Sequence, residues 1–65
     1  MNIGEIIKNL RLEKNISQQK LASEIGVSQK AVDYWERGVN EPKASYIVLL
    51  ADFFGVSCDF LLGRD

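Results

Sequence analysis

The sequence predicts an all-α fold, a compact domain of five helices. Apolar residues recur at i, i+3 and i+4 spacing along one segment after another, and no segment alternates as a half-buried strand does. Residues that cap helices precede most of these segments, and glycines follow them. The length of 65 residues allows one domain near the lower size limit for an unaided core, and a hydrophobic content of 46% is adequate for a helical bundle.

The first expected helix runs from about Ile3 to Lys14. Asn2 in front of it and Glu5 three residues later match a capping box, in which each side chain bonds the backbone N–H of the other residue. Apolar residues follow at helical spacing, so this helix is expected to bury one face. They are Ile3, Ile6, Ile7 and Leu10.

Two short helices with a tight turn between them are expected at the centre of the chain. The first runs from about Gln18 to Ile25 and the second from about Gln29 to Arg37, each preceded by a serine that can serve as N-cap. Gly26 between them can adopt the left-handed conformation that ends a helix. This pattern is typical of a helix-turn-helix, whose second helix reads the DNA major groove. The expected core side of the unit consists of Leu21, Ala22, Ile25, Val27, Val32 and Trp35.

Two further helices are expected after a loop at residues 39–43. The fourth runs from about Ala44 to Phe54 and ends at Gly55. The last is short, with Ser57 as N-cap, and ends near Leu62. The core stripe of the fourth helix consists of Ile47, Leu50, Ala51 and Phe54, whereas Leu49 and Phe53 lie off it and are either exposed or covered by the bundle. The glycines, Gly4 among them, are interpreted as helix punctuation rather than a phosphate-binding loop.

Composition excludes several classes of protein. One cysteine and no histidine exclude a disulfide framework and argue against a zinc site. Because a histidine base is missing, no Ser-His-Asp or Cys-His arrangement exists, and no enzyme activity, cofactor, metal or small-molecule substrate is expected. No apolar run approaches the roughly 20 residues of a membrane span, and the N-terminus lacks signal-peptide features. A single thiol fits a reducing compartment, so the expected location is cytoplasmic.

The charge balance is unusual for a DNA-binding protein. The net charge is −1, whereas a basic patch is the usual footprint of nucleic-acid binding. Residues 1–43 hold seven basic and six acidic side chains, so the acidic excess lies in residues 44–65. We therefore expect weak non-specific affinity for DNA and a need for dimerisation.

The whole chain, residues 1–65, resembles the phage lambda-type repressor and Cro (XRE-type) helix-turn-helix family. The resemblance rests on the motifs ISQQKLA, IGVS and W-E-x-G, followed by Pro42, in family order and with all five helices in register. It implies a single DNA-binding domain with its helix-turn-helix core at residues 18–37. It also implies a homodimer on the major groove of a palindromic double-stranded operator, acting as a transcriptional regulator of the repressor type.

The resemblance assigns base reading to three residues of the second central helix, and a fourth candidate, Asp33, lies near the same face. Gln29 matches the first residue of the recognition helix, and its amide can pair bidentately with adenine. Lys30 and Tyr34 match the other groove-facing positions, and Lys30 can donate to guanine. Tyr34 departs from the small or amide residues common there, so its base preference is open. Asp33 is expected to repel phosphate, and it either accepts from cytosine N4 or pairs with Lys30 or Arg37.

Other residues match positions that contact the DNA backbone in relatives. Gln18 corresponds to a phosphate-binding residue at the start of a helix, where the helix dipole adds positive charge. Ser28, Asn40, Lys43 and Arg37 are expected to lie along the same backbone path. Phosphate contacts of this kind orient a protein on DNA and carry no sequence information directly.

The resemblance also suggests a structural ion pair between Arg11 and Glu36, which ties the first helix to the third. A dimer interface is expected at the last helix and the loop before it, around Cys58, Asp59 and Leu61. Two alternatives remain at this level: the antitoxin of a toxin–antitoxin pair, and a protein-interaction domain that has lost DNA binding.

Overall fold

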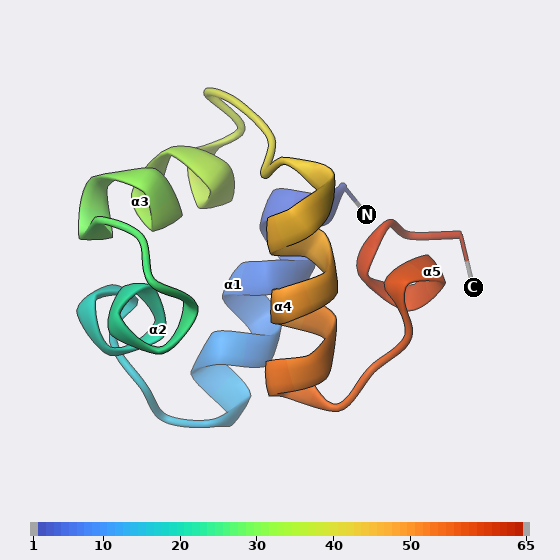
Figure 1. Cartoon of the computed structure of the whole chain (residues 1–65), viewed down its shortest axis with the longest axis horizontal. Coiled ribbons are helices and arrows are strands. Elements are labelled where there is room, and N and C mark those ends of the chain that lie inside the picture. The colour runs from blue at the N-terminus through green and yellow to red at the C-terminus, as the bar shows by residue number, and fades with distance from the viewer. Residues whose placement is uncertain (1, 65) are drawn as a thin grey trace.

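Five helices form where the sequence predicts them. The structure is a computed structural model that describes residues 2–64, and this range holds no strand. Met1 and Asp65, which the predicted domain includes, lie outside the described residues. The all-α fold class is confirmed. The helices are α1 (Ile3–Glu13), α2 (Gln18–Ile25), α3 (Gln29–Arg37), α4 (Ala44–Phe54) and α5 (Cys58–Leu61) (Figure 1).

Local capping explains most of the helix starts. The Asn2 side chain accepts from the Glu5 N–H at 2.9 Å and Glu5 accepts from the Asn2 N–H at 3.3 Å, so the predicted capping box is present. Three serines cap later helices in the same way, each accepting from the backbone N–H three residues on. They are Ser17 before α2, Ser28 before α3 and Ser57 before α5.

Two helix ends differ by one residue from the prediction. Helix α1 stops at Glu13 because Asn15, a residue type that tolerates the left-handed region, turns the chain with φ 57°. The following N–H, that of Ile16, then returns to the carbonyl of Arg11 at 3.3 Å. Leu62 keeps helical dihedrals and its N–H bonds the Cys58 carbonyl at 2.9 Å, so it caps α5 rather than belonging to it.

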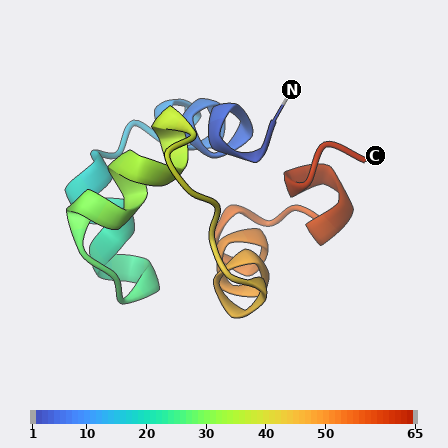
Figure 2. The same ribbon diagram turned by 90° about the horizontal axis from the view of Figure 1, so that it is seen from above.

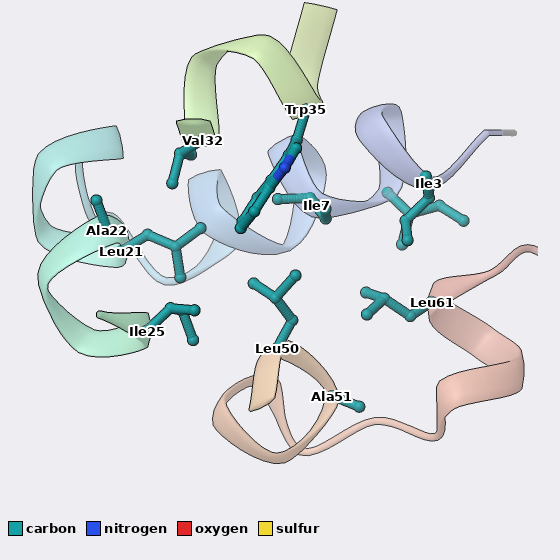
Figure 3. Packing of buried hydrophobic residues seen from close by; sticks show 11 residues of the cluster. Ile3, Ile7, Leu21, Ala22, Ile25, Val32, Trp35, Leu50, Ala51 and Leu61 are labelled. Atoms are coloured by element: carbon teal, nitrogen blue, oxygen red, sulfur yellow. The ribbon is translucent and has the colours of Figure 1, made fainter. Parts of the chain in front are cut away.

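The core is shared by all five helices. Trp35 of α3 points between α1 and α4 toward Leu21 and Leu50, and Leu61 of α5 points into the same core from the other side (Figure 3). Burial of such apolar surface is the main favourable term in folding a small domain. The buried apolar residues are Ile3, Ile6, Ile7, Leu21, Ala22, Ile25, Val32, Trp35, Leu50, Ala51 and Leu61.

Gly4 has a packing role that the sequence reading missed. A Cβ atom built on Gly4 would overlap the carbonyl oxygen of Trp35 and lie 3.2 Å from that of Glu36. The first turn of α1 therefore touches the end of α3 directly, and only glycine permits this approach. Its interpretation as helix punctuation is wrong, because it lies inside α1 and ends no helix.

The helix-turn-helix and the last helix lie at opposite ends of the molecule. Helices α2 and α3 form one end, α5 forms the other, and α1 and α4 lie between them in both views (Figures 1 and 2). The longest extent of the molecule is 27 Å. Within residues 2–64, every helix is too short or too polar to cross a bilayer.

Candidate nucleic-acid interface

The turn between α2 and α3 has the geometry that the sequence predicts. Gly26 adopts the left-handed conformation, with φ 87° and ψ 34°, and its N–H bonds the Ala22 carbonyl at 2.8 Å. The Val27 N–H bonds the same carbonyl at 3.0 Å, and Ser28 then caps α3. Ala22 is buried, and its small side chain lets α3 pack closely on α2. The turn therefore sets the direction of α3 relative to α2.

Helix α3 has one buried side and one side that faces outward. Val32 and Trp35 are buried, whereas Gln29 and Lys30 at its start are exposed. Tyr34 is half-buried, so part of its ring stays at the surface. The three side chains best suited to base contact therefore share the outward side of one rigid helix.

Tyr34 lies between two cationic side chains. The Lys30 ammonium is 5.6 Å from the centroid of its ring, and the guanidinium carbon of Arg37 is 5.4 Å from it. Both distances are within the range of cation–π attraction. Tyr34 thus contacts one positive group about a turn before it and another about a turn after it on α3.

Asp33 is paired with residues from two helices. Its Oδ2 accepts from Arg37 Nε at 2.9 Å, and its Oδ1 accepts from the Gln18 side-chain Nε2 at 3.3 Å. Of the two pairings left open by the sequence, the structure contains the one with Arg37. Both carboxylate oxygens therefore have donors before any DNA is present.

Gln18 connects α2 to α3 through its side-chain amide. Besides the contact with Asp33, its Nε2 donates to Glu36 Oε1 at 3.1 Å. An amide nitrogen carries two hydrogens, and each of these is directed at a carboxylate. Sequence reasoning missed both contacts, because neither partner is near Gln18 in the chain. The prediction that Gln18 binds phosphate stays a prediction.

The predicted ion pair between Arg11 and Glu36 is confirmed. Arg11 Nε and Nη2 donate to the two Glu36 oxygens at 2.7 and 3.0 Å, and Nη1 donates to the Ile16 carbonyl at 2.9 Å. The hydrogen bond to Glu36 raises the pKa of Arg11, with a smaller opposing effect of burial. Because the two side chains are only 10% and 3% exposed, this is a buried ion pair and not a surface one.

An open groove of about 560 Å³ brings several predicted contact residues together. Lys30 and Tyr34 line it from α3, and Ser28 lines it from the turn. Asn40 and Lys43 line it from the loop that follows α3. The groove therefore joins predicted base-reading residues to predicted backbone-contact residues on one surface.

The last helix and its C-cap expose a partly different set of residues from those expected at a dimer interface. Leu61 is fully buried and points toward Leu50 (Figure 3), so its assignment to the interface is wrong. Cys58 is half-buried and Asp59 is exposed. Phe60 and Leu62, which the prediction omitted, are 40% and 41% exposed. Phe60 and Leu62 lie directly on either side of the buried Leu61, and three consecutive apolar residues define no helical stripe that could have told them apart.

Two other expectations concern residues outside the helix-turn-helix. Leu49 is 45% exposed, whereas Phe53 is half-buried, with the Lys14 ammonium 5.3 Å from its ring centroid. As far as the described residues extend, no three acidic, cysteine or histidine side chains are grouped to hold a metal ion.

The chain belongs to the helix-turn-helix family, whose model matches residues 7–61. This assignment confirms the resemblance to lambda-type repressors and defines a class of DNA-binding regulators rather than enzymes. In a crystal structure, the P22 c2 repressor bound to a synthetic operator superimposes with a TM-score of 0.93 and 34% identity. That match covers 100% of this chain and 98% of the repressor chain.

Curated relatives with similar sequences are regulators of transcription. The activator BcrR of Enterococcus faecalis is 36% identical over 65 residues, all of this chain and 32% of the relative. The regulator AnsR of Bacillus subtilis is 35% identical over all of this chain and 55% of its own length. Repressor protein C2 of Salmonella phage P22 is 35% identical over 97% of this chain and 29% of its own length. This chain thus spans between 29% and 55% of the length of these curated relatives.

Proposed function

We propose that this chain is a sequence-specific DNA-binding domain that regulates transcription as a repressor. The observation that carries the proposal is the outward side of α3, where Gln29, Lys30 and Tyr34 stand on a helix whose other side is packed into the core. The likeness to a repressor solved with its operator supports the same use of this surface. Repression then follows from occupation of a promoter.

In this proposal, α3 enters the major groove with its N-terminal end facing the bases. Gln29 pairs with adenine through one donor and one acceptor, and Lys30 donates to guanine. Ser28, Asn40 and Lys43, which line one groove of the protein, contact the phosphates beside the bases that are read. Few of these groups are cationic, so base contacts contribute a large share of the affinity.

We further propose a homodimer on a palindromic operator, formed through α5. Exposed apolar side chains of Phe60 and Leu62 are available to a partner, with Cys58 and Asp59 beside them. Helix α5 lies at the opposite end from α3 in a molecule 27 Å long (Figure 2). A twofold axis beside α5 is therefore compatible with two α3 helices about 34 Å apart, one turn of DNA.

The proposed compartment is the cytoplasm, which fits the free thiol of Cys58. Selection of bound sequences from a random duplex pool tests the whole proposal. A repressor of this kind should enrich a roughly palindromic site with half-sites about one helical turn apart. Enrichment of no sequence would contradict the proposal and favour a domain that binds proteins instead.

A further inference from the structure

Asp33, Gln18 and Arg37 form one end of a hydrogen-bonded network that crosses three helices. Arg37 and Gln18 both donate to Asp33, and Gln18 also donates to Glu36. Glu36 is held in turn by the buried Arg11 of α1. The carboxylate of Asp33 is thus placed by contacts in α2 and α3, and is not a freely moving surface charge.

We propose that Asp33 is an intramolecular competitor of DNA, occupying donors that a backbone phosphate takes when the duplex binds. This inference rests on the proposed DNA-binding function. Carboxylate and phosphate oxygens are both anionic acceptors that favour guanidinium and amide donors. Gln18 lies at the start of α2, where the helix dipole favours an anion, and the Arg37 side chain is 58% exposed and accessible to one.

The competition acts on the part of the affinity that is independent of sequence. A phosphate that engages Arg37 must first displace Asp33, and the cost is the same for operator and for random DNA. The affinities for operator and for random DNA are lowered by the same factor. Base contacts then contribute a larger share of the remaining binding free energy. This explains how a chain with net charge −1 binds DNA through a few directed contacts while holding a carboxylate on its reading helix.

Direct competition and general repulsion predict different results in a double-mutant cycle. A repelling charge acts through space, so its removal should raise the affinity equally whether or not Arg37 is present. A competitor acts through its donor, so its removal should have little effect once Arg37 is replaced. Asp33→Asn, Arg37→Gln and the double variant separate these cases. Asp52→Asn, which makes the same chemical change at an exposed site on α4, is the matched control.

The measurements are binding of the full chain to its selected operator and to a random duplex, at several salt concentrations. Thermal unfolding verifies that each variant is folded, and Asn at position 33 can still accept from Gln18. Asp33→Asn should raise affinity for both duplexes about three- to tenfold and leave the salt dependence nearly unchanged, because Arg37 contacts the phosphate in both proteins. In the Arg37→Gln background, the increase in affinity caused by Asp33→Asn should fall to the increase caused by Asp52→Asn.

Three results would overturn the inference. An equal gain in both backgrounds would assign Asp33 to long-range repulsion. Loss of operator binding alone, with random DNA unaffected, would assign Asp33 to base reading. Absence of duplex binding by both the unmodified chain and Asp33→Asn would overturn the proposed function itself, and the inference with it.

Discussion

The backbone of Gly4 in α1 lies directly against the carbonyl oxygen of Trp35 at the end of α3, with no room for a Cβ atom between them. Trp35 is the largest side chain of the core, and α3 is the proposed reading helix. The close approach therefore fixes the position of α3 on α1. A residue far from the proposed DNA contacts thus influences the geometry of the reading surface.

Gly4→Ala should destabilise the fold, although the same change inside an ordinary helix stabilises by about 0.5–1 kcal/mol. The added methyl group must push α1 away from α3, and overpacking of this kind costs about 1–3 kcal/mol. Urea unfolding measures the difference. Lys8→Ala, at an exposed site on the same helix, should change stability by no more than about 0.5 kcal/mol. A stabilised Gly4→Ala variant would contradict the close contact.

Arg11→Met should cost about 3–5 kcal/mol, because it leaves the Glu36 carboxylate buried without its charged partner. Urea unfolding at neutral pH provides the value. Glu36 raises the pKa of Arg11. The contribution of the charged Arg11 to the free energy of unfolding is therefore complete at neutral pH, and it declines only as the pH rises through the strongly alkaline range. A loss below about 1 kcal/mol, typical of surface pairs, would show that the pair is solvated.

Gln29→Ala should relax the preference for one base pair in each half-site and cost about 1–3 kcal/mol per bidentate contact. Lys43→Ala is the contrasting variant, because a phosphate contact carries no direct sequence information. It should weaken binding to operator and random duplex alike and reduce the salt slope by about 1. Competition binding against single-base operator variants separates the two effects. If both substitutions left base preference unchanged, the assignment of the reading surface to α3 would fail.

Phe60→Glu should prevent dimerisation, because it introduces a charge into the proposed apolar interface on α5. Sedimentation with and without operator reports the assembly, and binding to an isolated half-site reports the integrity of each subunit. Operator affinity should fall while half-site affinity is retained. Leu49→Glu, at a site on α4 with a similar exposure of 45%, is the control and should remain dimeric. Equal behaviour of the two variants would exclude α5 as the interface.

The sequence by itself determined the five helices and most of their ends. Capping by Asn2 and the serines, and the left-handed conformation of Gly26, involve residues within four positions of each other, so their effects can be predicted from local spacing. The family motifs also predicted the pairing of Arg11 with Glu36, although not that the pair is buried. The exposed position of Gln29 at the start of α3 follows from the same register.

Only the tertiary structure decided which side chains α5 exposes, where Gly4 touches α3, and which donors form hydrogen bonds to Asp33. A helix of four residues such as α5 is too short for its pattern to define a face, so the burial of Leu61 depends on how α5 docks against the rest of the core. Gly4 meets Trp35, and Asp33 meets Gln18, on other helices and at separations along the chain for which spacing carries no information, whereas the pairing of Asp33 with Arg37 four residues away was among the sequence alternatives. Contacts of this kind exist only after the helices pack, because the packing of the shared core brings the distant groups together.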